Sequence, residues 1–270
     1  MDTTLLSSPV PERRLLERTD LWRRRRLERT KQSIREIVYA KQRRHAGVRR
    51  RLAAQYLTGS GLEIGPLHLP LRVPSSVEVR YVDRFDIHAI RAHYPELDGY
   101  LIVEPDIIDD GETLPTVQDV SVDFVIANHM IEHCEDPIRT IKSFLRVLRP
   151  GGVIYMAVPD RRFTFDRDRS PTPLEHIRRD HAEGPDWSRR QHYEEWAVFH
   201  DEVPADGVQE RADDLQRRNY SIHYHVWTPS EFLDLLLDCR RELDMPLQVE
   251  AVERNNHEFI VIMSRAAETA

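Results

Sequence analysis

Residues 122–137 read Val-Asp-Phe-Val-Ile-Ala-Asn-His-Met-Ile-Glu-His-Cys-Glu-Asp-Pro and join a mostly apolar segment to a polar, ionisable one. The first part, Val122–Ala127, predicts a buried strand. The polar residues that follow it are Asn128, His129, Glu132 and His133. Asp136 and Pro137 then have the residue types of a helix N-cap and a first helical turn. Because open α/β sheets bind ligands at the carboxyl ends of their strands, this stretch is our first candidate for a functional site.

Around this stretch, apolar segments alternate with helical patterns. The strands that we expect are Leu62–Ile64, Val77–Val82, Leu101–Val103, Val122–Ala127, Val153–Val158, Leu247–Val252 and Phe259–Met263, the last two as a closing hairpin. After Asp136, apolar residues recur every three or four positions and indicate an amphipathic helix. The alternation predicts an α/β fold with a doubly wound, mostly parallel seven-stranded sheet. Residues 159–225 lack this alternation of strand and helix patterns, which predicts an insertion after the fifth strand.

Charge is distributed unevenly along the chain. Residues 1–56 carry 16 Lys or Arg and 6 Asp or Glu, whereas the remainder carries 23 and 40. The basic segment has apolar residues at helical spacing and predicts a helical arm. This arm is either a solvated docking arm through which copies associate, or a contact for nucleic acid, an acidic polymer or an anionic membrane surface. The acidic balance of the remainder argues against nucleic acid as a partner of the main domain.

The sequence also limits the compartment in which we expect the protein. Its two cysteines, Cys134 and Cys239, are too few for a disulfide framework and fit a reducing environment. The first residues lack the pattern of a secretory signal, and no apolar run approaches the roughly 20 residues of a membrane span. We therefore expect a soluble, cytoplasmic protein.

Short motifs at the expected strand ends carry a family resemblance. They are Leu62-Glu63-Ile64-Gly65-Pro66, Val82-Asp83, Asp109-Asp110-Gly111-Glu112-Thr113-Leu114-Pro115 and Leu148-Arg149-Pro150-Gly151-Gly152. This ordered set resembles the class I S-adenosylmethionine-dependent methyltransferases with a UbiE/UbiG-like core. The resemblance covers about residues 60–160 and the closing hairpin, and it implies a Rossmann-like fold with S-adenosylmethionine as cofactor.

The resemblance also assigns roles to residues. Glu63 and Gly65 belong to the first cofactor motif, Asp83 holds the ribose hydroxyls, and Asp110 and Gly111 lie beside the adenine. The full set of implied cofactor-binding residues is Glu63, Gly65, Pro66, Asp83, Arg84, Asp109, Asp110, Gly111, Asn128 and His129. The residue types agree independently, because a carboxylate at a strand end can accept both hydroxyls of a diol and a glycine admits a ligand close to the backbone. The sequence departs from the family in one loop, where Pro66–Pro70 replaces the later glycines.

The pattern His129-x-x-Glu132-His133 has several interpretations. It matches a zinc peptidase motif, which we reject because here it follows a strand of a nucleotide-binding-like sheet. It also suits a divalent metal held by His129, Glu132 and His133. UbiG-like quinone methyltransferases and small-RNA 2′-O-methyltransferases have a similar metal cluster, with Glu at the first position. Without a metal, His133 is our candidate general base, oriented by Glu132. The structural alternative is that His129 packs on the cofactor and His133 is a hydrogen-bonded turn residue.

A second histidine group, His223, His225 and Trp227, alternates along a strand-like segment. If this segment is a strand, alternation places all three side chains on one face. We expect the two histidines to meet His133 at the acceptor end of the cofactor. There they hold acceptor hydroxyls or complete the shell of a metal ion. Trp227 then stacks on a sugar ring or, alternatively, belongs to the core. The candidate substrate-binding residues of the insertion and its end are Asp160, Arg161, Phe163, His181 and Trp227. Their mixture of charge and aromatic rings suits a polyhydroxylated substrate or, alternatively, a solvated loop joined by ion pairs.

The predicted parts are a basic helical arm (1–56), the cofactor-binding half of a methyltransferase domain (57–160), a substrate-binding insertion or lid (161–227), and a closing helix and hairpin of the same domain (228–270). The segments around residues 128–137 and 158–166 look like those of bacterial methyltransferases of surface or storage polysaccharides. We therefore expect an O-methyltransferase of polysaccharide biosynthesis that acts on a sugar or oligosaccharide hydroxyl. The alternatives are an RNA-directed methyltransferase and a non-catalytic module that binds a cofactor or a partner.

Overall fold

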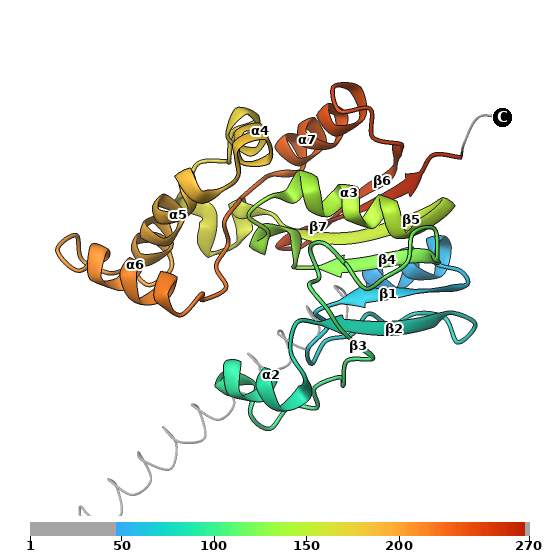
Figure 1. Cartoon of the computed structure of the whole chain (residues 1–270), viewed down its shortest axis with the longest axis horizontal. Coiled ribbons are helices and arrows are strands. Elements are labelled where there is room, and N and C mark those ends of the chain that lie inside the picture. The colour runs from blue at the N-terminus through green and yellow to red at the C-terminus, as the bar shows by residue number, and fades with distance from the viewer. Residues whose placement is uncertain (1–46, 268–270) are drawn as a thin grey trace, which may run out of the picture. The chain divides into compact units, whose positions relative to one another are not determined.

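A single seven-stranded sheet organises the computed structural model, which describes residues 47–267 (Figure 1). The strands are β1 (Ser60–Ile64), β2 (Glu78–Asp83), β3 (Ile107–Ile108), β4 (Val122–Asn128), β5 (Leu148–Pro159), β6 (Leu247–Asn255) and β7 (Glu258–Arg265). They lie in the order β3-β2-β1-β4-β5-β7-β6, and only β7 runs antiparallel to its neighbours. The prediction of a doubly wound, mostly parallel seven-stranded sheet with a closing hairpin is confirmed.

One predicted strand is misplaced. Leu101–Val103 forms no strand, and Leu101 is 92% exposed. The edge strand is instead β3, a few residues later, where Ile107 and Ile108 pair with the last two residues of β2. Residues 101–103 therefore belong to a loop, and a short apolar segment in a single sequence does not distinguish a loop from a strand.

Six helices are labelled in the described chain (Figure 1), and some of them cover the faces of the sheet. They are α2 (Ile87–His93), α3 (Pro137–Val147), α4 (Leu174–Glu183), α5 (Asp186–Phe199), α6 (Val208–Arg217) and α7 (Pro229–Arg241). The predicted cap of α3 is present, because the Asp136 carboxylate accepts a hydrogen bond from Arg139 N at 2.9 Å. The apolar face of α3 packs with α7 on one side of the sheet, and the helical residues 48–56 pack on the other. Both faces of the central strands are thereby buried, as expected of a parallel sheet.

The insertion after β5 is folded and has a small core of its own. Helices α5 and α6 enclose a cluster that includes Tyr193, Trp196 and Leu215. Tyr224 N donates to the Glu132 carbonyl at 2.8 Å, and Asp160 forms a β-bridge with Trp227. These bonds place α4, α5 and α6 at the carboxyl ends of β4 and β5 (Figure 1). The insertion therefore lies over the edge where the sequence predicts a site.

The predicted basic arm falls largely outside the described residues. Within residues 1–56, only 47–56 are described, and they are helical. The division of the chain at residues 56, 160 and 227 stays a prediction. In the described part of the chain, no helix is both long and apolar enough to cross a membrane.

Candidate active site

Three polar residues lie at the carboxyl ends of three adjacent strands of the sheet. Glu63 lies next to the end of β1, Asp83 ends β2 and Asn128 ends β4. Because β1 pairs in parallel with both β2 and β4, the three side chains belong to the same edge of the sheet. Glu63 is 1% and Asp83 9% exposed, so this edge buries two carboxyl groups. Buried carboxyl groups at a strand edge need partners, and these two have few within the protein.

Two glycines shape the same edge in different ways. Gly65 has a φ of +58°, and a Cβ placed there would meet no other described atom within 4 Å. The space beside Gly65 is therefore open. At Gly111, by contrast, a Cβ would lie 2.5 Å from Ile64 Cγ2, so this glycine lets the loop after β3 pack directly against β1. Gly65 therefore leaves space that a ligand can occupy, whereas Gly111 allows the adjacent loop to pack closely against β1.

The Glu63 carboxylate is only partly satisfied. One oxygen accepts a hydrogen bond from Leu71 N at 2.8 Å, whereas the other is buried and has no hydrogen-bond partner among residues 47–267. Burial raises the pKa of Glu63 to about 7, although Leu71 N and Arg49 oppose the shift. Both polar atoms of the Asn128 side chain are also buried; this amide lies beside the Glu63 carboxylate and opposes the rise of its pKa, but completes no hydrogen bond of normal geometry within the described chain. These orphaned groups point to a polar ligand at the edge of the sheet.

The acidic residues of the next two strand ends have different surroundings. Asp83 accepts one hydrogen bond, from Phe85 N at 3.1 Å, and burial raises its pKa. Arg84 turns towards His93, 3.3 Å away, and packs over the Phe85 ring. Asp109 accepts from Thr116 N and Thr116 Oγ1, so it holds the loop together. The contact of Asp110 with adenine, like the other cofactor contacts, stays a prediction.

His129 belongs to a charged network that the sequence did not reveal. Its Nε2 lies 2.7 Å from Glu258, which also accepts hydrogen bonds from Arg49 and Asn255. Burial disfavours a charged imidazole, but the hydrogen bond to Glu258 and the charge of Glu132 raise the pKa of His129. Arg49 and Glu258 are 209 residues apart in sequence, and no local pattern marks either of them.

Glu132, His133 and His223 form a compact triad, in which one donor atom of each side chain lies within 4.8 Å of the others. His133 Nδ1 donates to the Ile222 carbonyl at 2.9 Å, and His223 Nδ1 lies 2.7 Å from Asp166. A carbonyl and a carboxylate only accept, so each Nδ1 carries a proton. Glu132 is 1% exposed, and neither of its oxygens has a hydrogen-bond partner in the described part of the protein.

With this geometry established, the chain was compared with known proteins. Residues 92–156 match the family model described as a methyltransferase domain. Over this segment, the chain has the sequence pattern of a methyltransferase domain. This match begins at the end of α2 and covers β3, the loop after it, β4, α3 and most of β5.

Two curated relatives match parts of the chain. A probable S-adenosylmethionine-dependent methyltransferase of Mycolicibacterium smegmatis is 38% identical over 95 residues, which are 34% of this chain and 32% of that protein. The malonyl-[acyl-carrier protein] O-methyltransferase of Methylococcus capsulatus is 41% identical over 63 residues, 23% of this chain and 21% of that protein. The chain thus spans a third or less of the length of the curated relatives it matches.

Solved structures were compared as well. A SAM-dependent methyltransferase of Aquifex aeolicus has a TM-score of 0.40 and 13% identity, over 77% of this chain and 82% of the other. A SAM-dependent methyltransferase of Methanosarcina mazei has a TM-score of 0.40 and 17% identity, over 81% of this chain and 97% of the other.

The sequence suggested that Glu132 orients His133, but the structure shows no hydrogen bond between the two side chains within residues 47–267. The Ile222 carbonyl fixes the His133 ring instead. Burial and the nearby His223 lower the pKa of His133 to about 3, where a neighbouring carboxylate was expected to raise it. Burial raises the pKa of Glu132. The predicted metal set also changes, because the residue that joins Glu132 and His133 is His223, whereas His129 groups with His257 and Glu258.

The predicted common face of His223, His225 and Trp227 does not form. Tyr224 N and His225 N both approach the Glu132 carbonyl, at 2.8 and 3.4 Å, so the backbone here is not an alternating strand. His223 faces His133, whereas His225 faces a separate group of residues from α4 and α5. Trp227 is 1% exposed and packs against Phe232 in the main core. It is therefore a core residue and not a platform for a sugar.

Among the other predicted substrate residues, Asp160 is also structural. It is 1% exposed and pairs with Arg162 at 2.6 Å. Arg161 donates to the Arg167 carbonyl, and His181 lies 2.9 Å from Asp136. None of these side chains joins the triad within residues 47–267, and only Phe163 is substantially exposed.

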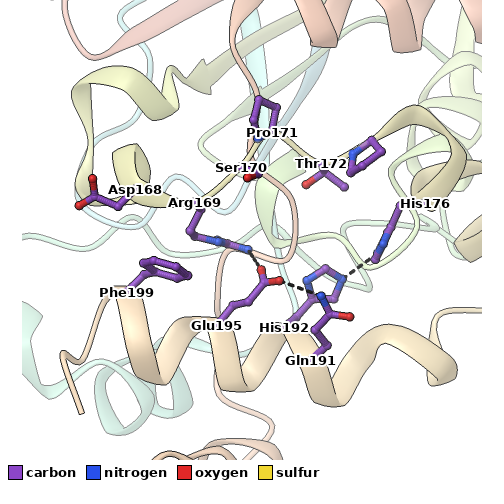
Figure 2. Close-up of a pocket in the computed structure, with 11 residues that line it drawn as sticks. Asp168, Arg169, Ser170, Pro171, Thr172, His176, Gln191, His192, Glu195 and Phe199 are labelled. Atoms are coloured by element: carbon purple, nitrogen blue, oxygen red, sulfur yellow. Dashed lines mark hydrogen bonds and ion pairs between the residues drawn. The ribbon is translucent and has the colours of Figure 1, made fainter. Parts of the chain in front are cut away.

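A cavity of about 410 Å³ opens on the insertion (Figure 2). Its walls present polar and apolar surface in similar amounts and come from the segment 168–173, α4 and α5. Arg169 links the cavity to the triad, because its guanidinium donates to Glu195 on the cavity side and to the His223 carbonyl at 2.9 Å. No short motif identifies these residues, since they are brought together only by the packing of the insertion.

The raised pKa of Glu63 yields a test of its burial. The ordinary pKa of the group is 4.5 and that of the folded state about 7, so in this window the folded state binds more protons and the free energy of unfolding falls as pH rises. We expect Glu63→Gln to gain stability relative to the wild type between pH 5 and 8, by up to a few kcal/mol. The difference in the free energy of unfolding is measured by denaturant unfolding of the two cofactor-free proteins across this pH range. The exposed control Glu210→Gln should show no such gain, and parallel pH curves for wild type and Glu63→Gln would contradict the assignment.

Proposed function

We propose that the chain transfers a methyl group from S-adenosylmethionine to a hydroxyl group of a sugar or polysaccharide precursor. The observation that carries this proposal is the edge formed by Glu63, Gly65 and Asn128. It combines buried polar atoms that lack partners in residues 47–267 with open space beside a glycine. Buried polar groups without hydrogen-bond partners reduce the stability of the fold, and a polar ligand bound at this edge would supply those partners.

The strand ends offer distinct contacts to such a cofactor. Asp83, at the end of β2, has a carboxylate with one backbone partner and can accept the two ribose hydroxyls. Glu63 and Asn128 provide a carboxylate oxygen and an amide for the polar groups of the methionine portion. When bound, S-adenosylmethionine supplies a methyl group on a positively charged sulfur. A buried, acidic edge suits that charge.

The triad is the candidate for handling the acceptor. A hydroxyl that gains a methyl group must lose its proton, so a base is needed beside the acceptor oxygen. The Glu132 carboxylate accepts no hydrogen bond from the described residues, lies 3.5 Å from His129 Nδ1, and is close to two imidazoles whose Nδ1 protons are engaged elsewhere. Each imidazole can therefore present Nε2 to an acceptor hydroxyl as a hydrogen-bond acceptor. We assign the base to Glu132 in place of His133, because burial raises the pKa of the former and lowers that of the latter.

The insertion supports a polyhydroxylated acceptor. Its cavity presents the polar side chains of Asp168, Arg169, Gln191 and Glu195 together with the ring of Phe199 (Figure 2). Sugars are commonly held by such a mixture of charged hydrogen-bonding groups and an aromatic face. A divalent ion held by Glu132, His133 and His223 is the second candidate for activating the acceptor, favoured by the convergence of their donor atoms.

Asp83→Ala tests the cofactor site. Loss of the ribose acceptor should weaken S-adenosylmethionine binding by roughly 1.5–3 kcal/mol, which is about 10- to 150-fold in Kd. Isothermal titration calorimetry measures the change. Asp213→Ala, an aspartate on α6 paired with Arg190, is the matched control and should bind like the wild type. If Asp83→Ala stays folded and its Kd is unchanged, Asp83 lies outside the site.

Glu132→Gln tests the base. It keeps the size of the side chain but removes the proton acceptor, and should lower turnover by about 10²- to 10⁴-fold while leaving the cofactor Kd near normal. Transfer of labelled methyl groups to a panel of oligosaccharides, RNAs and small metabolites provides the assay. His133→Gln should lose less activity than Glu132→Gln. The reverse order would return the base to His133, and an RNA product would replace the sugar proposal.

A further inference from the structure

A second cluster of ionisable side chains lies inside the insertion, separate from the triad. His176 and Asp180 are one turn apart on α4, His192 lies on α5, and His225 comes from the segment that ends the insertion. One donor atom of each lies within 4.8 Å of the other three. Figure 2 shows His176 and His192 facing each other at the wall of the cavity. Three imidazoles and a carboxylate gathered in this way need a physical explanation.

The cluster is almost fully buried. Asp180 is 1%, His192 4% and His225 0% exposed. Burial, with the neighbouring imidazoles, lowers the pKa of both His192 and His225 to about 3, so both rings are neutral near pH 7. A neutral imidazole cannot compensate the charge of Asp180, yet it is the form that binds metal ions.

Protons alone do not satisfy these atoms. His176 Nε2 lies 3.1 Å from His192 Nε2 and 3.2 Å from one Asp180 oxygen, Oδ2. At most one proton resides between the two imidazole nitrogens, and Oδ2 accepts no hydrogen bond from any described residue. His225 Nε2 is 3.7 Å from the same oxygen, too far for a hydrogen bond. This buried carboxylate oxygen therefore has imidazole nitrogens close to it but accepts no hydrogen bond of normal geometry from the described residues.

The distances between these donor atoms instead fit the ligand atoms around a single metal ion. Zinc binds imidazole nitrogen and carboxylate oxygen at about 2.0–2.2 Å, so neighbouring donors of a tetrahedron are about 3.3–3.5 Å apart. The two pairs that include His176 Nε2, at 3.1 and 3.2 Å, lie close to this value. A nitrogen-rich set of four protein donors favours zinc over magnesium or calcium, which prefer oxygen.

The surroundings also resemble those of metal ligands. Ser188 Oγ donates to the other Asp180 oxygen, Oδ1, at 2.8 Å and orients the carboxylate. His225 Nε2 lies 3.2 Å from the Glu135 carbonyl, which places its proton there and leaves Nδ1 with a lone pair. That Nδ1 is buried and has no hydrogen-bond partner in the part of the chain described. Such outer contacts fix the ligand atoms of a metal site and the tautomer of its histidines.

We propose that His176, Asp180, His192 and His225 bind a zinc ion that holds the insertion in place. Four protein ligands make a closed site, which is typical of a structural role. The ion joins α4, α5 and the segment after α6, and this segment places His223 only two residues from His225. The ion therefore fixes one side of the acceptor triad. The proposal does not depend on the identity of the methyl acceptor.

Metal analysis of the full-length chain, produced without a histidine tag, tests the proposal. After saturation with zinc and dialysis, we expect about one ion per chain by mass spectrometry, and about one cobalt ion with the strong visible absorption of a tetrahedral site when cobalt replaces zinc. His192→Gln and Asp180→Asn should lose the ion. Ser188→Ala should keep the four ligands but bind zinc about 10- to 100-fold more weakly in a chelator competition.

Glu132→Gln is the matched control, because it alters the other cluster and should retain the zinc ion. Loss of the metal in Glu132→Gln with retention in His192→Gln would move the ion to the triad and overturn the proposal. A wild-type chain that holds less than about a tenth of an ion after saturation would overturn it as well. The wild-type measurements need no variant, so a chain that binds no ion overturns the proposal even if a substitution prevents folding.

Discussion

The arrangement of the site depends on the hydrogen bonds that the backbone carbonyl of Glu132 accepts. This carbonyl accepts Tyr224 N at 2.8 Å, with His225 N at 3.4 Å, and so fastens the end of the insertion to the polar end of β4. The same residue aims its side chain at His133 and His223. One residue therefore sets both the position of the insertion and the chemistry beneath it. A shift of this contact would move the imidazole of His223 away from the carboxylate, because the two groups are held by the same short segment.

Two buried glutamates show how the surroundings divide roles between identical side chains. Burial alone would raise the pKa of both Glu258 and Glu132. Glu258 receives hydrogen bonds from His129 and Arg49, and its pKa is lowered, so it is a permanent anion of the framework. Glu132 receives none from the described residues, and its pKa is raised. An anion that is fully paired can only support the structure, whereas one that is left unpaired is available to a substrate proton or a cation.

The sequence predicted what local patterns encode. The apolar run Val122–Ala127 and the capped helix after it are present because burial and helix capping act over a few residues. The strand-end positions of Glu63 and Asp83 followed from the same periodicity. The contents of the insertion did not follow, because its contacts join distant residues. The alternation at residues 223–227 was misleading, since the hydrogen bonds to Glu132 bend the backbone and send neighbouring histidines in different directions.

That divergence has a mechanical consequence. His223 and His225 are separated by one residue, yet one belongs to the acceptor triad and the other to the proposed zinc site. Tyr224, between them, is held by its backbone to Glu132 and by its hydroxyl to Tyr193 on α5. Arg169 adds a third tie, because it donates to the carbonyls of both His223 and Tyr224. The segment is thus fixed by bonds to the sheet, to α5 and to the cavity wall. A change at the proposed zinc ligands is therefore transmitted to His223 through a backbone that has little freedom to absorb it.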